Sequence, residues 1–303
     1  MSTPQALAAG SISVSRPGPP PWRFRPSSSE LVWAIAFVAP YAAVFLAFVV
    51  YPVAYGLALA SDPSLYADLI SDPLYVRTVT NTVLFVGLSV NLKMFVALLV
   101  SGFFMRRRWW VRALLVVYVL PWALPSVPAF VSFHWMLIGE YGFLDSLLSA
   151  LFGIDGPIWF NDRWLALGSN VVAYVWKWMP FWTIVFLAGR MAIPREIYEA
   201  AEIDGASGPR RFLHVVYPLL ANMYLVCTLL ATLWTIGEFT TVFLVSGGGP
   251  ALSTEVLATL GIHYAFDTAR PSLGVAAMLS ALPVLIPITI MLMRRLETRG
   301  VQL

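Results

Sequence analysis

Six long stretches of the chain are almost wholly apolar, and short polar segments separate them. They cover about residues 31–60, 78–105, 112–138, 165–189, 218–245 and 272–293. An α-helix needs about 20 mostly apolar residues to cross the hydrocarbon core of a bilayer, and each stretch is long enough. The strands of a membrane barrel would instead alternate in runs of about ten residues. The pattern therefore predicts an all-α integral membrane protein with six transmembrane helices.

Two features interrupt this pattern. The apolar run 144–152 is too short to span a bilayer, and it predicts an interfacial or re-entrant helix on the outer face. Among the prolines inside the long stretches are Pro40, Pro52, Pro121, Pro125, Pro128, Pro283 and Pro287. Membrane helices tolerate proline where neighbouring groups satisfy the freed carbonyls. Two interpretations stay open, namely irregular helix packing and a cavity between broken helices.

The composition supports the membrane class. Hydrophobic residues make up 59% of the 303 residues, and the mean hydropathy is +0.77, whereas soluble domains are about half apolar. Residues 1–30 are rich in Pro, Ser, Ala and Arg, which predicts a disordered cytoplasmic tail. Residues 31–295 are predicted to form the transmembrane domain, and residues 296–303 a short cytoplasmic C-terminal tail.

Basic residues mark one side of the predicted bundle. Most of the 19 Lys and Arg residues lie in the N-terminal tail, after the second and fourth apolar stretches, and at the C-terminal end. Because cytoplasmic loops of membrane proteins carry an excess of these residues, both termini are predicted to be cytoplasmic. The segment between the fourth and fifth stretches is predicted to be cytoplasmic as well.

Candidate catalytic and metal-binding groups are sparse. Cys227 is the one cysteine, so no disulfide can form within the chain. His134, His214 and His263 are far apart and lack the spacing of metal ligands. No Ser/His/Asp or Cys/His arrangement stands out. The sequence therefore predicts neither an enzyme nor a metal site, and no nucleic-acid partner.

The predicted cytoplasmic segment 194–220, PREIYEAAEIDGASGPRRFLHVVYPLL, is unusually polar. Seven of its 27 residues are charged, about twice the average density of the chain. Pro194 suits the start of a helix, and Gly205 suits the left-handed position that ends one. Small and apolar side chains recur on one face, at Ile197, Ala200, Ala201 and Asp204. Such a narrow face can enter the groove of a partner; the alternative is a solvated connecting loop.

This segment resembles the EAA signature of binding-protein-dependent ABC importer permeases. The matching residues are Glu199, Ala200, Ala201, Asp204, Gly205 and Ala206, followed by Phe212 and Pro218 at the spacing of the family. NTVLF at Asn81, WKWMPFWTIVFLAGRMAIPREIYEAA before the motif, and SGGGPALSTEVLATLGIHYAF from Ser246 are similar to the sugar-transporter branch. The resemblance covers most of residues 31–295.

The resemblance implies that this segment is a coupling helix, which seats in a cleft of a separate ATP-binding subunit. This chain has no P-loop, because Lys93 and Lys177 precede Met94 and Trp178 rather than Ser or Thr. The chain itself is therefore expected to bind no cofactor, and ATP and Mg belong to the partner. The implied assembly contains a second permease, an ATP-binding subunit dimer and an extracytoplasmic solute-binding protein. Its expected location is the bilayer of the bacterial cytoplasmic (inner) membrane.

Three charged residues fall inside predicted membrane helices and are candidates for function, since each costs about 2.5–3.5 kcal/mol or more at the bilayer centre. At ~1.5 Å per residue, Glu238 would lie about 10 Å from the outer end of its helix, Lys177 about 18 Å and Lys93 about 24 Å. Depth alone therefore makes Lys177 the nearer partner of Glu238.

In related sugar permeases the helices before and after the EAA loop line the substrate cavity. This resemblance points to Tyr174, Lys177, Trp178, Phe181, Thr235 and Glu238. Aromatic faces and hydroxyl groups suit a sugar. The family often has amides or small residues at the positions of Lys177 and Glu238, so a structural ion pair between these two is an alternative to substrate contact.

The predicted function is thus the permease subunit of an ATP-driven importer for a sugar or related polyol. The rival hypothesis is an ion-coupled secondary transporter in which Glu238 and Lys177 relay protons or ions. Such transporters are often built from inverted repeats, which the sequence does not display. The sequence does not specify the sugar, nor whether the second permease is a different chain or another copy.

Overall fold

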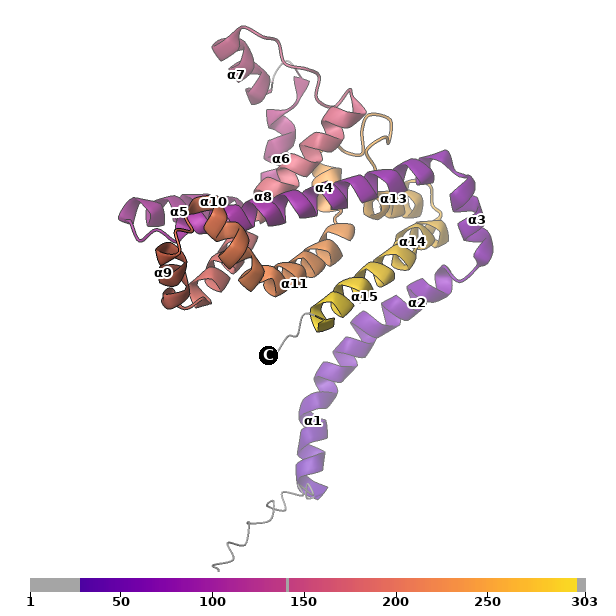
Figure 1. Ribbon diagram of the computed structural model, residues 1–303. Coiled ribbons are helices and arrows are strands. Elements are labelled where there is room, and N and C mark those ends of the chain that lie inside the picture. Colours follow the sequence, from indigo (N-terminus) through magenta and orange to yellow (C-terminus); the bar gives the residue numbers. More distant parts are fainter. Residues whose placement is uncertain (1–27, 140–141, 299–303) are drawn as a thin grey trace, which may run out of the picture. The chain divides into compact units, whose positions relative to one another are not determined.

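The computed structural model describes residues 28–139 and 142–298, and within them every regular element is helical. The predicted N-terminal tail therefore lies outside the described residues, apart from the start of the first helix, and so does most of the predicted C-terminal tail. Two compact units are present, Met1–Ala54 and Tyr55–Leu303. Figure 1 shows the described helices along the chain.

The first unit holds α1 (Ser28–Phe45), the π-helical turn η1 (Leu46–Val50) and the start of α2 (Tyr51–Leu59). Helix continues through Pro40. No residue is buried in the most apolar window of Leu31–Leu59. A helix that is apolar on all sides requires a bilayer or a protein partner around it, so this helix fits the predicted first transmembrane segment.

The second unit contains the remaining helices. In chain order they are α3 (Pro63–Ser71), α4 (Pro73–Phe104), α5 (Trp109–Ala123), α6 (Ser126–Met136), α7 (Phe143–Phe152), α8 (Arg163–Ala192), α9 (Arg195–Ile203), α10 (Gly208–Arg211), η3 (Phe212–Val216), α11 (Tyr217–Ile236), α12 (Thr240–Val245), α13 (Leu257–Ile262), η4 (His263–Asp267), α14 (Pro271–Leu279) and α15 (Leu282–Thr298). Aspartates begin three of them: the carboxylates of Asp62, Asp72 and Asp162 accept hydrogen bonds from first-turn backbone N–H groups of α3, α4 and α8.

Five helices of the described chain are long and apolar enough to cross a membrane. They are Leu31–Leu59, Pro73–Phe104, Arg163–Ala192, Gly208–Ile236 and Pro271–Arg295. Helices α5 and α6 qualify only as a pair, and a 93° bend separates them. By length and composition the structure thus has up to six spans, as the sequence predicts. The bend falls at Leu124 and Pro125, so this proline-rich stretch is a broken helix.

The fifth predicted helix, 218–245, is wrong in its limits. The helix already begins at Gly208 and ends at Ile236. Gly237 follows as the C-terminal cap, and α12 resumes at Thr240. The sequence pattern missed this break because the residues on both sides of it are equally apolar.

The core of the second unit lies where α4, α8 and α11 pack together (Figure 1). Met94 and Ala97 from α4, Phe186 from α8 and Ala231 from α11 are fully buried there. Near the N-terminal end of α4, helices α13 and α14 pack together at two glycines, Gly261 and Gly274. A Cβ atom on Gly274 would lie 2.4 Å from the carbonyl oxygen of Gly261. Only glycine permits this close approach of two backbones.

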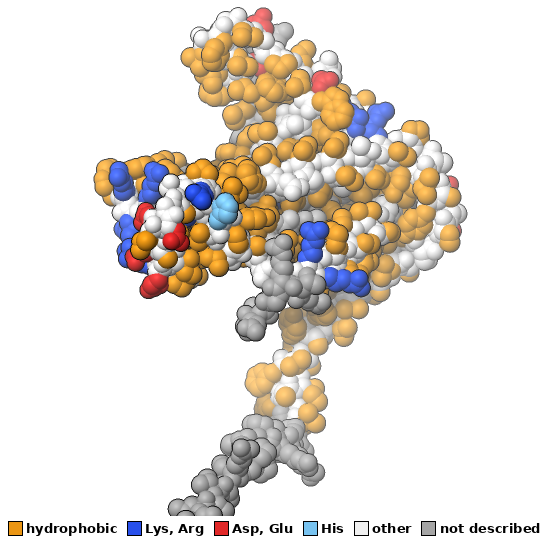
Figure 2. All heavy atoms as spheres, in the orientation of Figure 1, with side chains coloured by type: hydrophobic (Ala, Val, Ile, Leu, Met, Phe, Trp, Pro, Cys, Tyr) orange, Lys and Arg blue, Asp and Glu red, His pale blue; other side chains and the backbone are white. Residues whose placement is uncertain are grey.

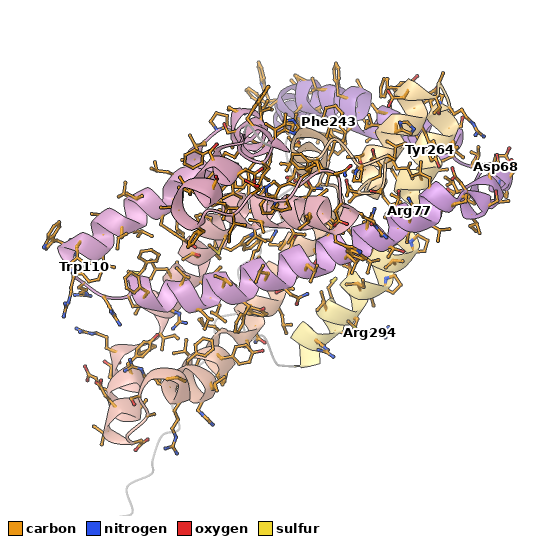
Figure 3. All side chains as sticks on the ribbon, turned by 90° about the horizontal axis from the view of Figure 1, so that it is seen from above. Asp68, Arg77, Trp110, Phe243, Tyr264 and Arg294 are labelled. Carbon is orange, nitrogen blue, oxygen red and sulfur yellow. The ribbon has the colours of Figure 1, made fainter. Side chains whose placement is uncertain are left out.

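The predicted short outer helix is present as α7, Phe143–Phe152. It ends at Gly153, whose φ of +64° lies in the left-handed region. Figure 3 shows that the labelled Asp68, Arg77 and Tyr264 lie at one end of the second unit and Trp110 at the other. The long helix α4 connects these two ends.

Candidate functional site

Helix α9 forms where the sequence predicts the coupling helix, and local backbone bonds fix its C-terminal end. Pro194 occupies the N-cap position. At the other end the N–H of Ala206 donates to the carbonyl of Ala201 at 2.8 Å, and the N–H of Gly205 donates to that of Glu202 at 3.1 Å. This pair of bonds is the Schellman arrangement. Gly205 has φ of +74°, as predicted for the residue that ends the helix.

The predicted apolar face of α9 is in part a free surface. Ile197, Ala200 and Asp204 line an open depression of about 570 Å³, together with Ala201 and Ala206. Ala201 is buried, whereas Ala200 and Asp204 are exposed. The structure therefore brings together the EAA-motif residues of this face as one small concave surface.

Two residues of α9 were missed by the sequence analysis. Ile203 is 87% exposed, more than any other large hydrophobic residue in the described part of the chain. The hydroxyl of Tyr198 donates to the carbonyl of Arg190 at 3.1 Å and so ties α9 to the end of α8. Burial raises the pKa of Tyr198, and nearby Arg190 and Arg211 oppose this rise to a smaller extent. The sequence offered one sign of Ile203, namely that it is an apolar residue outside the predicted apolar face of α9.

A polar cluster joins the three core helices. Nζ of Lys93 in α4 lies 3.3 Å from the hydroxyl of Tyr174 in α8 and 3.2 Å from Oγ1 of Thr235 in α11. The two hydroxyls lie 2.9 Å apart. All three residues are buried. Tyr174 and Thr235 are thus neighbours, and their place in a substrate pathway stays a prediction. Lys93 joins them, although depth placed it furthest from the outer face.

Lys177 does not contact Glu238, so the alternative of a structural ion pair between these two residues is wrong. Nζ of Lys177 donates to the carbonyls of Pro121 at 2.8 Å and Trp122 at 3.2 Å, and to that of Leu124. These carbonyls end α5 at the break, where the last turn of a helix lacks partners within the helix. A cation also stabilises the negative end of the helix dipole. Depth alone could not predict this contact, because it ignores the direction in which a side chain leaves its helix.

Glu238 lies in the break between α11 and α12. One oxygen of its carboxylate accepts from the backbone N–H of Thr241 at 2.8 Å and from the Thr241 hydroxyl at 2.9 Å. This side chain therefore caps the start of α12. The expectation of a charge inside a continuous helix is wrong here because the helix has already ended at Ile236.

The two remaining predicted pathway residues have aromatic neighbours. The ring of Phe181 lies 5.6 Å from Trp122, 5.0 Å from Trp182 and 6.0 Å from Trp234, measured between ring centroids. The indole N–H of Trp178 is buried and has no hydrogen-bond partner. Since indole N–H groups usually find a partner when they are buried, Trp178 has an unused donor.

A second polar network lies at the far end of α4. The amide nitrogen of Asn81 donates to the carbonyls of Ser253 and Glu255 at 2.8 and 2.9 Å, and its oxygen accepts from Arg163 at 2.7 Å. Glu255 is 5% exposed, and burial raises the pKa of its carboxyl group. A Cβ on Gly248 would lie 2.1 Å from this carboxylate. Asn81 thus fixes the glycine-rich loop that precedes α13.

Comparisons with known proteins agree with this architecture. The family described as "Binding-protein-dependent transport system inner membrane component" matches residues 93–300, and the chain belongs to this family. One relative is the sulfoquinovosyl glycerol transport system permease protein SmoG of Agrobacterium fabrum, 32% identical over 79% of this chain and 82% of the relative. Another is the trehalose/maltose transport system permease protein MalF of Thermococcus litoralis, 35% identical over 49% and 50% of the two chains.

A solved structure has the same fold. It is a bacterial ABC transporter involved in the import of the acidic polysaccharide alginate, with a TM-score of 0.76 and 19% identity over 89% of this chain and 96% of that chain. The family match, with 32% identity to a permease relative, makes the chain a multi-pass permease of the ABC importer type, and this structure shows its fold. In the part of the chain that the structure describes, no three His, Cys, Asp or Glu residues are grouped as metal ligands would be.

Proposed function

We propose that this chain is the permease subunit of an ATP-driven importer and forms part of the translocation pathway for a sugar or related polyol. The observation that carries this proposal is α9. This helix begins after Pro194 and ends in the two backbone bonds at Gly205 and Ala206, bears the EAA motif of the family and exposes Glu199, Ala200 and Ile203. A short helix with defined ends can transmit a displacement instead of unfolding under it.

The proposed partners follow from two features of this chain: its sequence has no P-loop, and its helices have exposed apolar faces. ATP and Mg would be bound by a dimer of ATP-binding subunits, one of which receives α9. A second permease would cover apolar helix faces, and an extracytoplasmic solute-binding protein would deliver the substrate. A second solved structure with this fold is a bacterial alginate ABC transporter in complex with an alginate pentasaccharide-bound periplasmic protein. We place the chain in the bacterial inner membrane with both termini and α9 on the cytoplasmic side, because the arginine-rich loops lie with α9.

For the substrate pathway we propose Tyr174, Trp178, Phe181 and Thr235. The free indole donor of Trp178 and the rings around Phe181 supply a hydrogen bond and aromatic faces, which suit a sugar. Lys177 and Glu238 have the structural contacts described above, so we assign them to holding the helix breaks.

In this mechanism the chain performs no covalent chemistry. Closure of the ATP-binding dimer would move α9, and Tyr198 would pass this movement to the end of α8 through its bond with Arg190. Helix α8 carries three of the four proposed pathway residues, so its displacement would change access to the pathway. The ion-coupled alternative has no support among the relatives described above.

The decisive experiment is purification of the tagged chain with its native partners. We expect an ATPase to copurify, and its hydrolysis to rise when sugar-loaded binding protein is added. Transport in proteoliposomes that follows an ion gradient without any ATPase would instead establish the secondary transporter. Replacing Ile203 by Asp should abolish ATPase copurification, while Ile154→Asp, also at an exposed isoleucine but away from α9, serves as the matched control.

A further inference from the structure

The other face of α9 lines a larger cavity, to which the proposed function assigns no ligand. Its volume is about 1010 Å³, and it lies between the end of α4, the start of α5, the end of α8 and the segment from α10 to η3. Six arginines line it: Arg106, Arg107, Arg112, Arg190, Arg195 and Arg211. Figure 2 shows Lys and Arg side chains gathered at this end of the unit, where Figure 1 labels α5, α9 and α10. The cavity is thus strongly basic.

Carboxylates neutralise little of this charge. In the described part of the chain, the lining has two carboxylates, those of Glu199 and Glu202. Among the residues that the structure describes, Arg211 is the one arginine of the cavity with a carboxylate within 4 Å, namely Glu202 at 3.6 Å. Cations held close together repel one another, and an anion between them relieves this repulsion. The cavity therefore has the charge of an anion-binding site.

Arg190 is a fixed cation in the wall of this cavity. It is 6% exposed, and its guanidinium donates to the hydroxyl of Ser101 at 2.7 Å and to the carbonyl of Leu98 at 2.8 Å. Gly102 leaves room for it, since a Cβ there would lie 3.3 Å from the guanidinium. A buried charge is costly unless it is paired with an opposite one. The neutral partners of Arg190 hold it in place but supply no negative charge.

The position of the cavity indicates the kind of anion. Trp109, 81% exposed, and Trp110 follow the arginine run directly, and tryptophans mark the headgroup level of a bilayer. Figure 3 places Trp110 at the end of the unit opposite Asp68 and Tyr264. The lining between the arginines is apolar and includes Leu99, Phe104 and Met191. A cationic site with apolar walls at this level matches an amphiphile better than a free ion.

We propose that this cavity binds the phosphate headgroup of an anionic phospholipid from the cytoplasmic leaflet. Basic pockets between membrane helices on this side are suited to such headgroups. The acyl chains would lie along the apolar wall, and the phosphate would contact the arginines. The lipid would touch α9 itself through Arg195, so it would bind next to the proposed coupling helix. The inference rests on the proposed orientation of α9 towards the cytoplasm.

The test is a titration of the purified full-length chain, in detergent, with dioctanoyl phosphatidylglycerol. The double variant Arg107→Gln/Arg112→Gln removes two exposed cations of the cavity. Its matched control, Arg108→Gln/Arg210→Gln, removes two neighbouring exposed arginines that do not line it. At ~1 kcal/mol per basic residue, about fivefold in affinity each, the first variant should bind about 25-fold more weakly. The control should bind like the wild type.

Four results would overturn the proposal. They are an absence of saturable binding, an equal loss in both double variants, equal affinity for inorganic phosphate, and displacement of the lipid by the ATP-binding subunits. The last would mean that a protein interface occupies the cavity. Dioctanoyl phosphatidylcholine is the neutral-headgroup control and should bind weakly. Because the titration needs no ATP hydrolysis, lipid binding without a copurifying ATPase would refute the proposed function and leave this inference standing.

Discussion

The amino group of Lys93 lies 3.3 Å from the hydroxyl of Tyr174, and the two residues come from α4 and α8. Thr235 of α11 completes the cluster and also donates to the carbonyl of Ala231 at 2.6 Å. The cluster is asymmetric. Tyr174 and Thr235 can satisfy each other without the lysine, whereas the lysine depends on both of them.

This asymmetry predicts the outcome of single substitutions in the cluster. Tyr174→Phe leaves a buried amino group with one partner, and it should lower the free energy of unfolding by about 1.5–3 kcal/mol. Lys93→Met removes the polar group and keeps the volume, so the loss should stay under about 1.5 kcal/mol. Thermal unfolding in detergent measures both changes. The double variant should be more stable than Tyr174→Phe alone; equal costs for the two single variants would contradict this account.

The second buried lysine should respond differently to the same substitution. Lys177→Met leaves the carbonyls of Pro121, Trp122 and Leu124 without their donor, and each unsatisfied buried group costs about 1–3 kcal/mol. We expect Lys177→Met to lower the free energy of unfolding by at least about 2 kcal/mol, more than Lys93→Met does. The same unfolding assay compares them. If Lys177→Met left the free energy of unfolding unchanged, water or a partner subunit would have to supply the hydrogen bonds to these carbonyls.

Gly205 should tolerate only residues that adopt a positive φ. A Cβ at this position meets no atom within 4 Å, so the cost of a substitution comes from the backbone alone, about 1–2 kcal/mol for a left-handed conformation. Gly205→Val should leave the chain inserted in the membrane but reduce ATP-driven uptake in proteoliposomes. Gly205→Asn is the matched control, because asparagine tolerates this conformation. Normal uptake by the valine variant would disprove the coupling role of α9.

The stability of the loop around Glu255 should depend on pH. Burial raises the pKa of this carboxyl above its ordinary value, so the folded chain binds a proton more tightly than the unfolded chain does. At a pH between the ordinary and the raised pKa, the unfolded chain holds fewer protons than the folded chain. The free energy of unfolding therefore falls as pH rises through this range. His263 and Asp267 add smaller, opposing effects.

Glu255→Gln should remove this contribution and raise the melting temperature at neutral pH, because the amide cannot ionise. At a pH below the ordinary carboxyl pKa the two proteins should melt alike. Melting temperatures recorded from acidic to neutral pH test this prediction. The exposed carboxylate of Glu196 provides the control, and Glu196→Gln should leave the pH profile unchanged. An unchanged profile in Glu255→Gln would assign the pH dependence to other groups.

The sequence predicted the local features of the coupling segment because neighbouring residues decide them. Pro194 at the helix start and Gly205 at its left-handed end follow from backbone sterics. Ile203 could not be identified in the same way, since its 87% exposure depends on how α9 stands away from α8. The role of this segment in contacting an ATPase stays a prediction.

The sequence by itself determined that this is a helical membrane protein with up to six spans, because a bilayer requires long apolar helices with internally bonded backbones. Tertiary structure alone decided where those helices break and which groups the charges inside them contact. Depth matches Lys177 with Glu238, yet Lys177 binds the carbonyl end of α5 and Glu238 caps α12. The physical reason is that orphaned backbone groups at helix breaks need partners, and their positions depend on packing between distant segments.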